Sequence, residues 1–405
     1  MKTRILFKPN AWILLLFTFS LLQLNAQAPA HLKYFGYVAI DCLYDDPLDV
    51  STLTNYISEV DTFSNIAHMC VYDYTDNIIA RTNDMNAHCV NPMLQVQSVF
   101  FEEVDTLAPS GTNYDLYSDF TSRWNTFMTI NASVFVPSKI SCFYIIDEPF
   151  WNGVSLAEMD TVCTLLKNAF PTIPILMVEA YTTVNVMQVP VAMDWVGFDR
   201  YGVFDPEFDV DFQNDLDTVK SRLSSPNQKI ILVIDDQWLP FYGDAGFSPD
   251  TMKYVVQNYY DLAVADTSVI GLIGYIWPGG LDDPGHLGVR NLTQGVIDKN
   301  VEIGQLIKAN FSPCSVQYVT ENEAINEQIL LYPNPVSDQL TLEFNSEQTI
   351  AGITIYNLVG EIEQFLPKIT TKSLSIATSD LPNGFYLLTV ELGDRRISER
   401  FSINR

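Results

Sequence analysis

Residues 140–151, ISCFYIIDEPFW, contain the pattern on which the fold prediction rests. Residues 140–146 are largely apolar, as in a strand that a parallel sheet buries on both faces. The run ends at Asp147 and Glu148, and Pro149 favours an extended backbone at Glu148. This stretch therefore predicts a buried strand with two acidic side chains at its carboxyl end.

A helix is expected next, because Ser155 and Glu158 form the Ser-x-x-Glu pattern of a helix start. The same alternation of short apolar runs and helical stretches recurs over residues 31–309. Strands are expected at 34–40, 65–72, 93–100, 140–146, 174–178, 195–198, 229–234 and 269–276. Helices are expected at 155–170, 208–223, 250–264 and 291–307.

Eight strands in about 280 residues favour an α/β fold, a (β/α)8 barrel of TIM type, whose usual size is about 250 residues. The alternative, a doubly wound open sheet, usually has a glycine-rich phosphate loop after its first strand. Here Asp41 and Cys42 follow the first strand without such a loop. We therefore expect a barrel over 31–309, with its chemistry at the carboxyl ends of the strands.

The charge of the chain narrows the possible partners. The 405 residues include 22 Lys+Arg and 49 Asp+Glu, which gives a formal net charge of −27. Such an acidic protein is a poor match for nucleic acid or for an anionic membrane, and it fits a neutral glycan better than a polyanionic one. The four histidines have no metal-ligand spacing, so we expect neither a metal nor a cofactor.

The N-terminus indicates export. Residues 1–26 combine a basic start, a short apolar run and small residues before a cleavage point, as a signal peptide does. No later segment is long and apolar enough to span a membrane. The six cysteines are expected to form one or two disulfides in an oxidising compartment, with their pairing left open.

The C-terminal region has a different pattern. Residues 310–328 resemble a linker, and residues 329–405 predict a small antiparallel β-sandwich, because short alternating runs are separated by turn residues. The opening Tyr-Pro-Asn-Pro at 332–335, the strand at 353–357, the segment LPNGFY at 381–386 and the basic end resemble the C-terminal sorting domain of the type IX (Por) secretion system of Bacteroidota. This resemblance implies recognition by that machinery, and passage through the periplasm to the cell surface or the medium.

Acidic and aromatic side chains gather at the expected carboxyl ends of the barrel strands. Three of the six tryptophans fall just past such ends. Aromatic rings can stack on the C–H faces of a sugar, while carboxylates bind its hydroxyl groups. The residues expected to bind a carbohydrate are Asp41, Asp147, Trp151, Asp199, Tyr201, Trp238 and Trp277.

Glu148 is the leading candidate for catalysis. Glycoside hydrolysis uses two carboxyl groups, one protonated and one ionised, and burial beside Asp147 would raise the pKa of one of them. The candidates for the second carboxyl group, in order, are Asp235, Glu179, Asp236 and Asp199. A separation of about 5–5.5 Å would indicate a retaining enzyme, and about 6.5–9.5 Å an inverting one.

Residues 147–149 and Trp277 also resemble motifs of (β/α)8-barrel glycoside hydrolases. Those enzymes have Asn-Glu-Pro after strand 4 and a tryptophan that supports the substrate after strand 8. The resemblance implies that Glu148 is the acid/base and that a nucleophilic glutamate ends strand 7. This chain has Asp235 and Asp236 at that place instead, each one methylene shorter.

Three functions follow as hypotheses. The first is a secreted glycoside hydrolase that acts on a polysaccharide by two-carboxylate chemistry. The second is a barrel without catalysis that binds a glycan or another surface partner, which the missing strand-7 glutamate favours. The third is a barrel hydrolase for an ester or amide, although no nucleophile for it is evident in the sequence.

Overall fold

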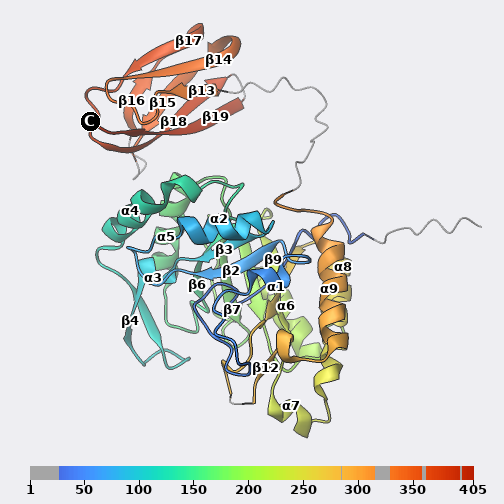
Figure 1. The fold of residues 1–405 in the computed structure, drawn as a ribbon. Coiled ribbons are helices and arrows are strands. Elements are labelled where there is room, and N and C mark those ends of the chain that lie inside the picture. Colours follow the sequence, from blue (N-terminus) through green and yellow to red (C-terminus); the bar gives the residue numbers. More distant parts are fainter. Residues whose placement is uncertain (1–26, 284, 315–328, 358–361, 393–394) are drawn as a thin grey trace, which may run out of the picture.

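The computed structural model describes residues 27–283, 285–314, 329–357, 362–392 and 395–405 (Figure 1). Eight parallel strands form one sheet with the order β1-β11-β9-β8-β7-β6-β3-β2, which curls into a nearly closed barrel. The predicted fold class is confirmed. The barrel strands are β1 (Tyr34–Tyr37), β2 (Ile66–Cys70), β3 (Asn91–Gln95), β6 (Cys142–Asp147), β7 (Ile175–Ala180), β8 (Trp195–Asp199), β9 (Lys229–Asp235) and β11 (Val269–Tyr275).

The barrel closes between β1 and β2. Asp41, just past β1, forms a parallel bridge with Met69 of β2. The Asp41 N–H donates to the His68 carbonyl at 3.0 Å, and the Cys70 N–H donates to the Asp41 carbonyl at 3.1 Å. A disulfide between Cys42 and Cys70 ties the same seam covalently.

Helices surround the strands and bury a large apolar layer against their outer faces (Figure 1). In α5, the Ser155 side chain accepts from the Glu158 N–H while the Glu158 side chain accepts from the Ser155 N–H, so the predicted helix start is confirmed. The helices are α1 (Ile57–Val60), α2 (Ile79–Ala87), α3 (Gln97–Phe100), α4 (Phe120–Asn131), α5 (Leu156–Ala169), α6 (Val210–Arg222), α7 (Pro240–Asp244), α8 (Met252–Ala265) and α9 (Gln294–Lys308).

The barrel region departs from the prediction in the segment after β3 and in two small antiparallel pairs. The strand expected over 93–100 ends at Gln95, where its pairing with β2 and β6 stops, and residues 97–100 form the short helix α3. Beyond α3 the chain forms an antiparallel hairpin of β4 (Phe101–Asp105) and β5 (Asn113–Leu116), which the sequence pattern did not indicate. A second small pair joins β10 (Gln237–Trp238) to β12 (Leu287–Gly288).

The C-terminal region is an antiparallel β-sandwich with its own apolar core, as predicted. One sheet contains β13 (Ile329–Tyr332), β14 (Gln339–Ile350) and β17 (Ile369–Ala377). The other contains β16 (Ile362–Leu366), β15 (Gly352–Tyr356), β18 (Gly384–Leu392) and β19 (Arg395–Ile403). The sequence pattern indicates strands at 339–344, 352–357, 373–376, 384–392 and 396–403, so β13 and β16 are additional to it.

The remaining predictions concern the chain ends and the cysteines. Residues 1–26, the expected signal peptide, and most of the expected linker lie outside the described residues. Cys314, near the start of that linker, forms a disulfide with Cys89, and Cys142 and Cys163 are free and buried. Within the described ranges, no helix has the length and apolar character needed to cross a membrane.

Candidate active site

A cavity of about 300 Å³ opens at the carboxyl ends of the barrel strands. Its floor consists of apolar side chains that point into the barrel, among them Met93, Leu176, Ile231 and Ile273. Its upper wall is polar and acidic. The polar and aromatic lining residues are His68, Gln95, Tyr144, Asp147, Glu148, Trp151, Asp199, Tyr201, Tyr275 and Asp282.

Glu148 occupies an unusual backbone position at the end of β6. Its φ is +47°, in the left-handed region that residues with a side chain rarely adopt. The extended backbone predicted from Pro149 is therefore wrong. Two hydrogen bonds stabilise the turn: the Glu148 N–H donates to the Val178 carbonyl at 2.8 Å, and the Asn152 N–H donates to the Glu148 carbonyl at 2.9 Å. Strain of this kind is concentrated at functional sites.

The carboxyl groups of Glu148 and Asp199 hydrogen-bond to each other inside the cavity. Burial, together with the charges of Asp147, Asp199 and Glu179, raises the pKa of Glu148 to about 9. Burial and the charge of Asp147 also raise the pKa of Asp199 well above its ordinary value. Since two carboxylates in contact cannot both ionise readily, the pair retains a proton at neutral pH.

The donor in this pair follows from the surroundings of Asp199. Its Oδ2 accepts from the Tyr201 hydroxyl at 3.2 Å. Its Oδ1 is buried and receives no N–H or hydroxyl donor from the described residues. The protonated Glu148 carboxyl is the group that donates to Asp199, and this contact lowers the pKa of Asp199 against the larger effect of burial.

Two further acids border the pair. The Asp147 carboxyl accepts a short hydrogen bond from the Tyr144 hydroxyl. Although Asp147 is exposed at the cavity mouth, the protein atoms packed around its carboxyl raise its pKa, and this effect outweighs the Tyr144 hydrogen bond. Asp282 accepts from the Tyr275 hydroxyl at 2.8 Å. No lysine or arginine is present among the described residues that line the cavity.

His68 lies in the cavity wall as a neutral imidazole. Burial lowers its pKa to about 4. Its Nδ1 accepts from the Ala39 N–H at 3.2 Å, so the proton resides on Nε2, which is 3.1 Å from Gln95 Oε1. The sulfur atoms of Cys42 and Cys70 lie near the ring, but they are bonded to each other and are not free thiolate ligands.

Three of the four acids ranked as possible partners of Glu148 do not line the cavity: Asp235, Asp236 and Glu179. Asp235 is buried at the end of β9, where it accepts from the Tyr242 hydroxyl at 2.6 Å and the Gly202 N–H at 2.7 Å. Asp236 is buried on the outer side of the barrel, 3.3 Å from Asn300 Nδ2. Burial raises the pKa of Asp235 to about 6 and that of Asp236 to about 8.

Glu179, the third of these acids, supports the site from behind. It is fully buried and accepts from the Thr183 hydroxyl at 2.6 Å and the Phe150 N–H at 2.9 Å. Burial raises its pKa to about 7. Because Phe150 lies two residues after Glu148, this contact positions the loop that carries the catalytic candidate.

The expected carbohydrate-binding residues are also divided. Asp147, Trp151, Asp199 and Tyr201 line the cavity. Trp277 is buried against Tyr37, with ring centroids 5.0 Å apart, and its Nε1–H donates to Glu59 at 2.6 Å. Trp238 donates to the Phe247 carbonyl at 3.1 Å, outside the cavity. Asp41 forms an ion pair with Arg81 at 2.9 Å and likewise lies outside it.

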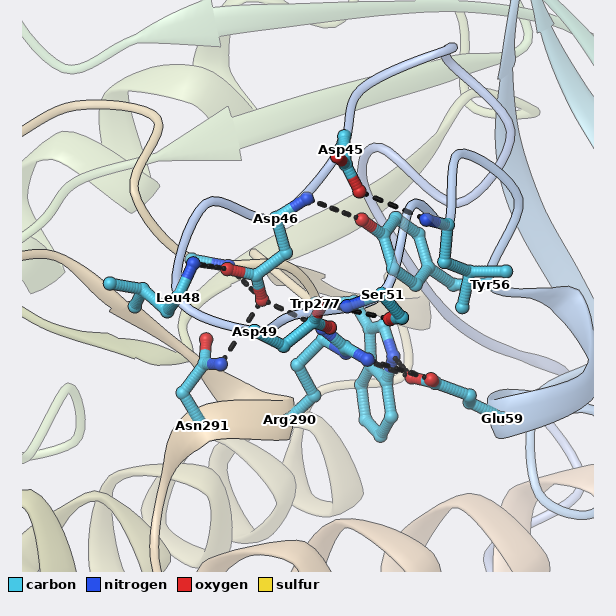
Figure 2. A network of polar contacts seen from close by, with 12 residues as sticks. Asp45, Asp46, Leu48, Asp49, Ser51, Tyr56, Glu59, Trp277, Arg290 and Asn291 are labelled. Carbon is cyan, nitrogen blue, oxygen red and sulfur yellow. Dashed lines mark hydrogen bonds and ion pairs between the residues drawn. The ribbon is translucent and has the colours of Figure 1, made fainter.

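Arg290 joins the loops after the first and last barrel strands (Figure 2). Its guanidinium contacts Asp46 and Glu59, each at 2.9 Å, and also pairs with Asp49. Asp46 is buried and additionally accepts from the Gly279 N–H at 3.1 Å. Trp277 donates to the same Glu59 (Figure 2), so this tryptophan belongs to the network that closes the barrel rim.

Comparisons with known proteins give a family for the C-terminal region only. Residues 330–404 match the secretion system C-terminal sorting domain. No curated protein matches the chain. Solved structures with a similar fold include an endo-beta-1,4-mannanase double mutant of Cellulomonas fimi, with 11% identity, a TM-score of 0.42 and coverage of 94% of this chain and 99% of that chain.

Two other structures are similar at the same level. Xylanase 10B of Thermotoga maritima has 11% identity and a TM-score of 0.44, covering 70% of this chain and 97% of that chain. A glucosidase of Croceicoccus marinus has 9% identity and a TM-score of 0.46, covering 86% and 95%. Likeness of this degree carries no argument about activity. The C-terminal sandwich is thus a secretion-system sorting domain, which implies secretion or a place at the cell surface.

Proposed function

We propose that the barrel hydrolyses glycosidic bonds in a carbohydrate outside the cell, with Glu148 as the general acid. The observation that carries this proposal is the hydrogen-bonded pair of Glu148 and Asp199 in a cavity at the carboxyl ends of the strands. A general acid must hold its proton at the working pH. A pKa of about 9 for Glu148 meets this requirement, and burial and neighbouring acids supply the cause.

The chemistry begins when a glycosidic oxygen replaces Asp199 as the acceptor of the Glu148 proton. Glu148 protonates the leaving oxygen as the bond to the anomeric carbon breaks. Asp199, which is already the ionised member of the pair, then faces the positive charge that develops on the sugar ring. Water then adds to the anomeric carbon and its proton returns to Glu148.

A neutral glycan fits the cavity best. Its acids would repel an anionic sugar, and no cation among the described lining residues offsets them. Tyrosine hydroxyl groups and Gln95 offer hydrogen-bond partners for sugar hydroxyls, and Trp151 offers an aromatic ring at the edge. The C-terminal sorting domain supports the proposal, because secretion would bring the barrel to extracellular polysaccharides.

The test is the activity of Glu148→Gln and Asp199→Asn on a panel of neutral polysaccharides and aryl glycosides. Loss of a general acid costs about 10²- to 10⁴-fold in rate, so both variants should lose at least a hundredfold. The exposed Asp298 on α9 supplies a matched control, Asp298→Asn, which should keep full activity. The native rate should fall as the pH rises towards the pKa of Glu148. Unchanged hydrolysis by Glu148→Gln would show that the assignment is wrong.

One observation favours a second candidate, glycan binding without catalysis. Asp235, at the place of the expected strand-7 nucleophile, is held by Tyr242 and Gly202 and does not line the cavity. If the native protein binds a glycan from the panel and releases no product from it, this second function is the correct one.

A further inference from the structure

A groove of about 550 Å³ adjoins the cavity on the side of β2 and β3. Gln95, at the end of β3, and Asp147, at the end of β6, line both spaces, so the groove and the cavity adjoin there. The outer wall of the groove includes residues of the hairpin β4–β5, namely Phe101, Glu102, Glu103 and Tyr114. The hairpin therefore extends the candidate site beyond the barrel rim.

Tyrosine rings with fixed positions line this groove. Tyr72 is 48% exposed, and its hydroxyl donates to the Cys42 carbonyl, which fixes the ring against the disulfide seam. Tyr117 stacks on the guanidinium of Arg123, whose centre is 3.7 Å from the ring centroid. Tyr114, on β5, is half-buried in the same wall. Rings held in this way lose little conformational freedom when a sugar stacks on them.

The charge of the groove indicates an uncharged ligand. Arg123 is its only lysine or arginine among the described residues, and that guanidinium also donates to the Ser98 carbonyl at 2.9 Å and the Val99 carbonyl at 3.0 Å. Asp73, Glu102, Glu103 and Asp147 make the lining acidic. An anionic chain would be repelled, whereas Gln97 and Asn152 can hydrogen-bond to sugar hydroxyl groups.

We infer that the groove binds the leaving-group side of a neutral oligosaccharide whose terminal sugar occupies the cavity. This inference rests on the proposed function. Glu148 must contact the scissile oxygen, and Asp147, the preceding residue, lines both spaces, so the bond lies at their junction. The cavity ends below at the apolar floor, so a chain that entered it could not continue downwards into the barrel. The protein therefore cleaves from chain ends.

Binding of oligosaccharides tests the groove without requiring turnover. Glu148→Gln protein is titrated with the mono- to pentasaccharides of the cello-, manno-, xylo- and laminari-series, by calorimetry. In at least one series, affinity should rise from the monosaccharide to the trisaccharide. Adding Tyr72→Ala or Tyr114→Ala should lower the affinity for the trisaccharide by about three- to tenfold. The affinity for the monosaccharide should stay unchanged. Adding Tyr254→Ala, an exposed ring on α8, should have no effect.

These measurements test binding in the groove independently of hydrolysis at Glu148. The groove proposal is wrong if Tyr72→Ala and Tyr114→Ala keep the native melting temperature and also keep the full gain in affinity with chain length. This conclusion holds even if the native protein hydrolyses the glycan. A panel in which no series binds more tightly with length overturns the groove proposal as well. Release of internal fragments instead of the terminal sugar overturns cleavage from chain ends. A gain with length that the ring variants abolish supports the groove, even if no hydrolysis occurs.

Discussion

Replacing Glu148 by glutamine should stabilise the fold at neutral pH, although it removes the proposed general acid. The pKa of Glu148 is raised from an ordinary value of 4.5 to about 9. Between these two values the folded protein holds a proton that the unfolded chain releases. The free energy of unfolding must then fall as the pH rises through this window. Glutamine keeps the shape of the side chain and can still donate to Asp199, but it has no proton to lose.

The size of the effect follows from the pKa shift. One pKa unit corresponds to about 1.4 kcal/mol, and pH 7 lies 2.5 units above the ordinary value of 4.5. The upper bound at pH 7 is therefore about 3 kcal/mol. Because Glu148 is partly exposed to the solvent in the cavity, screening reduces this, and we expect about 1.5 kcal/mol.

Urea denaturation at pH 5, 6, 7 and 8 measures the effect. The free energy of unfolding of Glu148→Gln minus that of the native protein should be small at pH 5 and should grow with each pH step. Asp298→Asn, an exposed change on α9, should show no such growth. A difference that stays flat from pH 5 to pH 8 would refute the argument that Glu148 is protonated in the folded protein.

Three further predictions concern stability outside the cavity. Arg290→Met should lower the free energy of unfolding by about 3 kcal/mol, since it leaves buried Asp46 without its cation. Urea denaturation at pH 7 should show this loss, and the loss should shrink in acid as protonation of Asp46 in the variant removes its unpaired charge. Cys89→Ala should cost about 5 kcal/mol under oxidising conditions, because the lost disulfide spans 225 residues, and reductant should then destabilise the variant less than the native protein. Ser155→Ala should cost about 1 kcal/mol through the lost helix cap and leave catalysis unchanged, which a melting curve and a rate measurement check together.

The barrel could be predicted because its strands are buried on both faces and must be apolar wherever they occur. The same requirement places Asp147 and Glu148 at a strand end, since neither side chain suits the interior. What the pattern does not contain is the irregular pairing of β6 with β7 between Tyr144 and Asp147. This irregularity and the left-handed backbone of Glu148 aim its side chain into the cavity.

Asp199, the residue that pairs with Glu148 in the cavity, is the last of the four candidates that the sequence suggests for the second carboxyl group. Asp235 and Asp199 both follow expected strands, and the resemblance to glycoside hydrolases favoured Asp235 because it lies at the strand-7 position. Tyr242 of α7 and Gly202 of the loop after β8 hold Asp235 outside the cavity, and no local pattern encodes the path of these two segments. One local signal was present: Asp199 and Tyr201 are two residues apart, so an extended backbone would put both on one side. Both line the cavity and hydrogen-bond to each other.

The acids at this end of the barrel fall into two groups that the net charge of the chain does not distinguish. Arg81 neutralises Asp41, and Arg290 neutralises Asp46 and Glu59 (Figure 2). Although burial opposes it, hydrogen bonds to Leu48, Gly279 and Arg290 hold the pKa of Asp46 below its ordinary value, so this acid stabilises the fold at neutral pH and loses that effect in acid.

The cavity acids show the opposite behaviour, because burial without a cation raises the pKa values of Glu148 and Asp199. Each therefore lowers the stability of the fold as the pH rises. In its rim loops this protein stabilises carboxylates by placing arginines beside them. In the cavity it places Glu148 and Asp199 beside each other without a cation. Groups that are held at a cost to stability, with shifted pKa values and in a cavity, are the ones expected to move protons. This contrast between the two groups of acids, and not the total charge of −27, is the reason to look for catalysis at Glu148 and Asp199.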